Sequence, residues 1–336
     1  LAYAVFWGAD ALWAQLTQQA GAVEMGAGTQ RGDISSSRFG IWANTFTLIA
    51  RHPLTGVGFG EFNAAWTLTP FPGRPTALFD HTHNLSLQLA VELGLPLALL
   101  VSGALLWALV RAARGSFALD DALGRGARAA FVIVALAALH SQLEYPLWYA
   151  YFLLPAALAL GFALGAGPRA AASPARAGAA PAVALVGAVM AVGGAAAVSD
   201  YLSVVAVFAP PAQAGPLDER IARGQRSVLF AHHADYAAVT TGLPATLEAQ
   251  ALGWRRAPHQ LIDARLMMAW ARAFAEGGDV ERARHVAARL REFRKTEADE
   301  FFAPCREADT PAFQCTAPTR AFHWRELLVT PAAPAR

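Results

Sequence analysis

The chain has 336 residues, of which 55% are hydrophobic and only 15% are charged, and its mean hydropathy is +0.33. This composition excludes an ordinary soluble domain and predicts an integral membrane protein. The formal net charge of +2 excludes a global electrostatic footprint for nucleic acid, and the single lysine, Lys295, excludes Schiff-base or P-loop lysine chemistry elsewhere in the chain.

The first part of the chain alternates apolar and polar segments. Residues 1–13 are typical of the end of an apolar span, and residues 20–37, rich in Gly, Thr, Gln and Ser, predict an exposed loop. Residues 38–52 predict a short amphipathic helix at the membrane surface, with N-cap candidates at 35–37 and a stop at Pro53. Residues 62–79, with three prolines, predict another loop.

Membrane spans are expected wherever about 20 apolar residues follow one another. The pattern gives four spans, at residues 85–110, 129–143, 147–164 and 182–198. The connecting segments 111–128 and 165–180 are biased toward arginine, which marks the inner side of the membrane. Residues of about 14–84 are therefore predicted to form a large loop outside, within a transmembrane region that covers residues 1–199.

Residues 200–336 carry charges throughout and predict a second, helical domain on the outer side of the membrane. Residues 261–294 show two helical patterns split by Glu276–Asp279, which favour an ordinary αα-hairpin, with a tetratricopeptide-like hairpin as the alternative. The only cysteines, Cys305 and Cys315, predict a disulfide in an oxidising compartment. A metal site there would need ligands beyond His323.

The outer loop gathers polar side chains that no membrane helix needs. They are four arginines and three histidines, at Arg31, Arg38, Arg51, Arg74, His52, His81 and His83. The loop also holds a glycine run at Gly56, Gly58 and Gly60. No strand precedes this run, so it is not a dinucleotide fingerprint, and close packing or a substrate-facing turn is favoured. Functional groups at the mouth of a membrane helix indicate chemistry at the boundary between water and lipid.

Three short sequences of this loop resemble the signature of the superfamily of O-antigen ligases, O-antigen polymerases and O-oligosaccharyltransferases. They are Arg38–Trp42, His52–Gly60, and His81–Gln88 followed by Glu92–Gly94. Leu143–Pro155 resembles, more narrowly, the pilin-type protein O-oligosaccharyltransferases of bacteria. The resemblance implies an all-α, polytopic, GT-C-like membrane glycosyltransferase, and the helical C-terminal domain, for which a TPR-like hairpin is the alternative, is then periplasmic. It also implies further helices upstream, so that this C-terminal portion is expected to be inactive alone.

Transfer of a sugar from a lipid pyrophosphate to a hydroxyl requires a base near neutral pH and a cation for the leaving group. We select His83 as the base and Arg38 as the cation, and both fall on motif positions that are regarded as essential in the resembled family. The alternatives are a helix cap or interfacial polar residue for His83 and a lipid-headgroup anchor for Arg38. The resemblance further implies an undecaprenyl-pyrophosphate-linked glycan as donor, and no metal or other cofactor.

Five further residues are candidates for substrate binding. Arg51 and Arg74 could bind phosphate, Asn84 could orient His83 or bind sugar, and Gln88 lies one turn further on the same helical face. Glu144, between two spans, could pair with an arginine of the outer loop or touch the acceptor. His81 and His83 could together ligate a metal, but the segment offers no clear additional ligands beyond Asp80, so we expect no metal.

We therefore expect a multi-pass protein of the bacterial inner membrane that transfers an oligosaccharide to Ser or Thr hydroxyls of periplasmic proteins such as pilin. Its expected partners are the lipid-linked glycan, the acceptor protein and membrane lipid, without nucleic acid. An O-antigen ligase or polymerase acting on the same donor is the alternative. Two alternatives belong to other functional classes. The first is a transporter or flippase, which would carry ionisable groups deep in its spans, and the second is a membrane anchor, which would leave the outer loop unexplained.

Overall fold

The computed structural model describes residues 28–118, 120–166, 179–210, 215–241, 247–306 and 312–332. Every regular element in these segments is a helix, so the predicted all-α fold is confirmed. The expected span at residues 1–13 and most of the expected inner loop at 165–180 lie outside the described residues.

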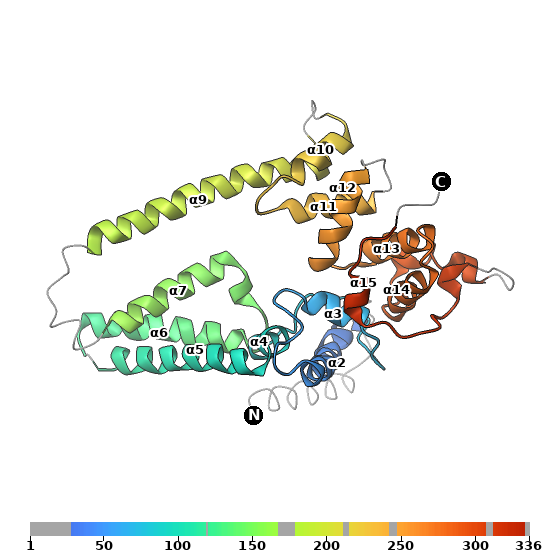
Figure 1. Ribbon diagram of the computed structural model, residues 1–336. Coiled ribbons are helices and arrows are strands. Elements are labelled where there is room, and N and C mark those ends of the chain that lie inside the picture. Colours follow the sequence, from blue (N-terminus) through green and yellow to red (C-terminus); the bar gives the residue numbers. More distant parts are fainter. Residues whose placement is uncertain are drawn as a thin grey trace.

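The apolar helices form the membrane part of the fold. Three of them lie side by side in Figure 1, namely α5 (Leu95–Ser116), α6 (Ala122–His140) and α7 (Ala150–Gly165). Among the described residues, α5, α6 and segment Pro181–Phe208 of α9 (Ala179–Phe208) are long and apolar enough to cross a membrane. At 16 residues, or about 24 Å, α7 falls short of that length, so only three of the four expected spans appear at full length.

The expected span at residues 85–110 is wrong in its outer part, where the structure has two helices. A short α4 (Leu85–Leu93) ends at Gly94, which has a positive φ of 77°, and α5 begins there. A Cβ atom at Gly94 would overlap the carbonyl of Leu54, and one at Gly56 would overlap the backbone of Glu92. The glycines therefore let residues 54–56 pack directly against the joint between α4 and α5, which is the close-packing alternative for the glycine run.

Residues 28–84, which are expected to lie outside the membrane and are called the outer segment below, contain more helix than their sequence predicts. α2 (Gly28–Arg51) begins inside the expected loop at residues 20–37, so the N-cap candidates at 35–37 lie within a helix. α3 (Phe62–Leu68) replaces part of the expected loop at 62–79, and all seven of its residues are buried. Local sequence signals fail here because burial of Phe62, Trp66 and Leu68 in a shared core favours the helix.

The C-terminal part consists of short helices. They are α10 (Leu217–Gly224), α11 (Ala231–Thr240), α12 (Leu247–Arg256), α13 (Ala264–Glu276), α14 (Val280–Glu292) and α15 (Trp324–Leu327), with 3₁₀ turns at Ala257–His259, Thr296–Ala298, Ala303–Arg306 and Phe313–Cys315. The predicted αα-hairpin is confirmed in α13 and α14. Cys305 and Cys315 form a disulfide with their Cα atoms 5.1 Å apart. α9 continues unbroken through residue 200, where the second domain is expected to begin.

The outer segment and the C-terminal part share one hydrophobic core, in which Trp66 of α3 packs with Phe293 and α3 lies beside α14 and α15 (Figure 1). Polar contacts reinforce this arrangement. The backbone N–H of Ile262 donates to Asn63 Oδ1 at 2.8 Å, and His285 Nε2 donates to the Leu68 carbonyl at 2.9 Å. The C-terminal part therefore helps to position the outer loop.

Candidate active site

Two loops meet at one end of the bundle formed by α5, α6 and α7. One precedes α4 at residues 80–84, and the other follows α6 at residues 141–148, where it includes the 3₁₀ turn Pro146–Trp148. Asn84 Nδ2 donates to the Gln142 carbonyl at 2.9 Å, and the Leu85 N–H donates to the Ser141 carbonyl at 2.7 Å. These bonds join segments that lie almost 60 residues apart in the chain, and they fix the two loops against each other.

The backbone of His83 has a φ of 53°, a left-handed conformation that residues other than glycine seldom adopt. The residues around it hold this conformation. Asn84 Oδ1 accepts from the Leu87 N–H at 2.9 Å and so caps α4, while Gln88 Oε1 accepts from the Thr82 N–H at 2.8 Å. The Gln88 amide also donates to Glu92. These contacts favour structural roles for Asn84 and Gln88 over the sugar contacts that are expected from their positions in the sequence.

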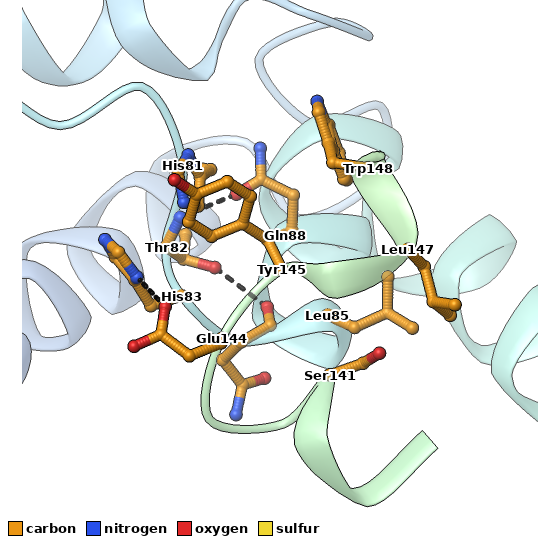
Figure 2. Close-up of a pocket in the computed structure, with 11 residues that line it drawn as sticks. His81, Thr82, His83, Leu85, Gln88, Ser141, Glu144, Tyr145, Leu147 and Trp148 are labelled. Atoms are coloured by element: carbon orange, nitrogen blue, oxygen red, sulfur yellow. Dashed lines mark hydrogen bonds and ion pairs between the residues drawn. The ribbon is translucent and has the colours of Figure 1, made fainter. Parts of the chain in front are cut away.

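Arg38, His83 and Glu144 come together from three segments of the chain. His83 Nδ1 lies 2.7 Å from Glu144 Oε2, and the Arg38 guanidinium forms an ion pair with the other carboxylate oxygen, Oε1. Figure 2 shows the His83 ring and the Glu144 carboxylate pointing toward one another. All three side chains are partly buried, so their charges are only partly screened by solvent. Glu144 thus bridges the two residues that we select as base and cation.

Burial lowers the pKa of His83 below its ordinary value of 6.5. The hydrogen bond and the charge of Glu144 raise it, whereas the charges of His81 and Arg38 lower it further. His83 is therefore neutral at pH 7. With the Nδ1 hydrogen directed at Glu144, the lone pair lies on Nε2, where a neutral imidazole can accept a proton.

Arg74 lies apart from these three residues, and its side chain is only 2% exposed. Its guanidinium donates to the carbonyls of Trp66, Thr67 and Thr69 at the end of α3, and it lies 3.2 Å from Glu292 of α14. Burial lowers the pKa of Arg74 to about 10, which leaves it charged at neutral pH. These contacts support a role in joining α3 to the C-terminal part, in place of the phosphate binding expected from the sequence.

Replacement of Arg74 with alanine is expected to destabilise the protein by about 3 kcal/mol, because three carbonyls and a half-buried carboxylate lose their partner. Denaturation of the purified protein in detergent measures this change. The exposed Arg265 on α13 provides a matched control, for which Arg265→Ala should change stability by less than about 0.5 kcal/mol. Unchanged stability with weakened donor binding would instead make Arg74 a phosphate ligand.

Arg51 is exposed at the C-terminal end of α2. Arg51 lies thirteen positions after Arg38 in the same helix, which corresponds to about 20 Å along the axis. Arg51 therefore does not belong to the group formed by Arg38, Glu144 and His83.

His81 is more closely involved in the site than its sequence position predicts. Its Nδ1 contacts the Asp80 carboxylate, its ring lies 4.4 Å from that of His83, and it packs against Tyr145. His81 and His83 thus each face a carboxylate through Nδ1. From the sequence, His81 is a candidate only as a metal ligand. Asp80, which directly precedes it, is the signal that could have indicated the contact between these two side chains. Among the described residues, no group of three or more His, Cys, Asp or Glu side chains is arranged to hold a metal ion.

An apolar groove of about 480 Å³ lies next to His83 and Glu144. Side chains of α4, α5, α6 and α7 line it, among them Leu89, Leu106, Val134 and Leu160. Leu85 and Leu147 contribute both to this groove and to the small cavity beside His83 and Glu144 that Figure 2 shows. The group formed by Arg38, Glu144 and His83 thus lies at one end of an apolar groove between membrane helices.

Comparison with known proteins agrees with the motif resemblance of the outer loop. The family described as "Virulence factor membrane-bound polymerase, C-terminal" matches residues 128–302, which is more than half of the chain. The chain belongs to the O-antigen ligase and oligosaccharyltransferase superfamily. A second family of this superfamily, described as "O-Antigen ligase", matches residues 1–102 and so includes Arg38 and His83. The apolar helices and this membership make the chain a polytopic membrane protein of the superfamily.

A relative within the superfamily is the general O-oligosaccharyltransferase of Acinetobacter baylyi, strain ATCC 33305 / BD413 / ADP1. It is 28% identical to the chain over 155 residues, which cover 45% of the chain and 25% of the relative. The chain thus matches only a quarter of that protein's length. No solved structure shows a significant match to the chain.

Proposed function

We propose that the protein transfers an oligosaccharide from an undecaprenyl-pyrophosphate carrier to an acceptor hydroxyl on the periplasmic side of a bacterial inner membrane. One observation carries this proposal, namely the group formed by Arg38, Glu144 and His83 at the head of the apolar groove. The group supplies the proton acceptor and the cation that glycan transfer requires, and the groove is suited to a long apolar carrier chain.

In the proposed reaction, His83 acts as the general base. Its Nε2 takes the proton of the acceptor hydroxyl as the hydroxyl oxygen forms a bond to the anomeric carbon of the sugar. The bond between that carbon and the pyrophosphate oxygen breaks, and the pyrophosphate leaves with the electron pair. Glu144 positions His83 because it accepts the Nδ1 hydrogen, and its negative charge stabilises the imidazolium that forms.

Arg38 is proposed to stabilise the leaving pyrophosphate. A guanidinium carries five N–H donors, so the ion pair with Glu144 leaves further donors for phosphate oxygens. The Glu144 carboxylate also couples proton transfer to departure of the pyrophosphate. It interacts both with His83, which takes up the proton, and with Arg38, near which the negative charge of the pyrophosphate develops. No step of this scheme uses a metal, and transfer is expected to continue in the presence of a chelator.

For the acceptor, we favour Ser or Thr hydroxyls of periplasmic or pilin proteins. The resemblance of Leu143–Pro155 to the pilin-type enzymes supports this choice, as does the name of the Acinetobacter relative. The two family descriptions favour the alternative of O-antigen ligation or polymerisation with the same donor.

A direct test uses the full-length protein in membranes that contain the lipid-linked glycan. Three acceptors are offered separately: a pilin, lipid A-core and a second lipid-linked glycan. Glycosylation of the pilin supports the proposal. Exclusive transfer to lipid A-core or to the second glycan would establish the ligase or polymerase alternative, and absence of transfer to all three would contradict the proposed chemistry.

Glu144→Gln is expected to reduce transfer by a factor of about 10 to 100 and to shift its pH dependence. Activity requires neutral His83 and therefore falls as the pH drops through the pKa of His83. Glu144 raises that pKa, so its removal should move the acid limb of the profile to lower pH. Transfer rates between pH 4.5 and 8 measure this shift. An acid limb that stays in place, or moves to higher pH, would show that Glu144 does not act through His83.

A further inference from the structure

The end of α2 meets the start of α15 in a cluster of cationic and titratable groups. The rings of His52 and His323 lie 5.7 Å apart, and Arg325 donates to the Val57 carbonyl at 2.6 Å. Arg51 and Arg325 are both exposed. Glu326 is the acidic neighbour of this cluster, but its carboxylate already accepts from the His323 N–H and pairs with Arg320. We call Arg51, His52, His323 and Arg325 the basic cluster.

The basic cluster lies beside the point where α5 begins. The Leu95 N–H donates to the Pro53 carbonyl at 2.8 Å, so the residues that follow His52 are bonded to the first residue of this membrane helix. Leu54 is 72% exposed, and Leu97 in the first turn of α5 is 45% exposed. Exposed leucines at the start of a membrane span, next to cations, place this surface at the boundary between acyl chains and headgroups.

The basic cluster is separate from the candidate active site, because about 20 Å of α2 lies between Arg51 and Arg38. Binding at the basic cluster is therefore independent of the proposed glycan transfer. The cluster also unites two parts of the chain, since Arg51 and His52 come from the outer segment and His323 and Arg325 from the C-terminal part.

We propose that the basic cluster binds the phosphate of an anionic phospholipid headgroup, with Leu54 inserted among the acyl chains. Clustered arginines near a membrane surface attract anionic lipids, and a guanidinium donates two parallel hydrogen bonds to phosphate. Because His323 and Arg325 belong to the C-terminal part, the bound lipid holds that part against the membrane.

The test uses the full-length protein in nanodiscs of equal parts phosphatidylglycerol and phosphatidylcholine. Native mass spectrometry then counts the lipids that the released protein retains. Wild type should retain phosphatidylglycerol preferentially. The preference should fall about 5-fold in Arg51→Gln and about 30-fold when Arg325→Gln is added, while Arg51→Lys and the control Arg265→Gln should keep it. Arg51 is the most informative position because it is exposed at the helix end, so its replacement tests binding more than folding.

Any of four outcomes would overturn the proposal. The first is an unchanged preference in the double variant, and the second is a loss in Arg51→Lys equal to that in Arg51→Gln. The third is displacement of phosphatidylglycerol by inorganic phosphate beyond a chloride control of equal ionic strength, which would indicate a site for free phosphate. Loss of glycan transfer in Arg51→Gln with lipid retention unchanged would likewise assign Arg51 to the substrate.

The histidines add a dependence on pH. Burial lowers the pKa of His52 and of His323 below 6.5, and the charges of Arg325 and Arg51 lower both further, as does His323 for His52. Glu326 acts in the opposite direction on His323. Both rings are therefore neutral at pH 7 and gain charge in more acidic solution, so retention of phosphatidylglycerol should rise as the pH is lowered below 6.5. The rise should disappear in the variant His52→Gln with His323→Gln, and a rise that persists there would contradict this part of the proposal.

Discussion

Replacement of His83 with asparagine is expected to reduce glycan transfer by a factor of about 10² to 10⁴, because the acceptor hydroxyl loses its general base. Asparagine is chosen because it tolerates the positive φ of this position better than most residues, so the loop should keep its conformation. Transfer to the acceptor is measured from the lipid-linked donor at matched membrane abundance.

The control for this variant is His233→Asn, which changes an exposed histidine of α11. It should transfer glycan at the wild-type rate. Wild-type transfer in His83→Asn would return His83 to the role of a polar residue at the membrane interface. A loss of rate that is accompanied by a loss of folded protein in His83→Asn alone would point to a structural role.

Arg38→Ala is the second variant with a large expected effect, a reduction of transfer by a factor of about 10² to 10³, because the departing pyrophosphate loses its cation. Arg38→Lys should recover part of the rate, since it restores the charge without the planar fork. The charge of Arg38 also lowers the pKa of His83. The acid limb of the pH profile should therefore move to higher pH in Arg38→Ala, opposite to the shift expected for Glu144→Gln.

The opposite shifts of the pH profile in Arg38→Ala and Glu144→Gln distinguish a role of Arg38 at the reaction centre from a role as a lipid-headgroup anchor. If Arg38 only anchored the helix α2, Arg38→Ala would reduce transfer without changing the pH profile, and Arg38→Lys would restore the full rate. Arg265→Ala serves as the control, because Arg265 is exposed on α13 and lies outside the candidate site.

The membrane helices were predictable because their composition alone specifies them. In α5, α6 and α9, the apolar runs are long enough to cross a membrane, and no tertiary contact is needed to recognise them. Their boundaries were less predictable. Hydropathy does not detect that Gly94 breaks the run at residues 85–110, because the break depends on the approach of the Leu54 backbone from another part of the chain.

α3 could not be predicted from its local sequence for a similar reason. Its seven residues are too few to form a stable helix alone. The helix forms because Trp66 enters a core completed by Phe293, more than 200 residues later, and because Arg74 satisfies the carbonyls at its end. Arg74 is a candidate for phosphate binding by its residue type, whereas its contacts depend on the fold.

The candidate site was predictable in part. The motif resemblance selected Arg38 and His83, and the structure brings them to the same carboxylate. Glu144 lies 106 positions after Arg38 and 61 positions after His83. Its pairing with an arginine of the outer loop was expected from the sequence, whereas its contact with His83 was not. The capping role of Asn84 was available from sequence, because asparagine directly before an apolar helical run is a common N-cap.

The most direct test of the central claim is a double-mutant cycle between His83 and Glu144, with transfer from the lipid-linked donor as the readout. If Glu144 acts through His83, adding Glu144→Gln to His83→Asn should lower the rate by less than about 3-fold, although Glu144→Gln alone lowers it by about 10 to 100-fold. Losses that multiply in the double variant would show that the two residues act independently, and they would contradict a reaction centre built on this pair.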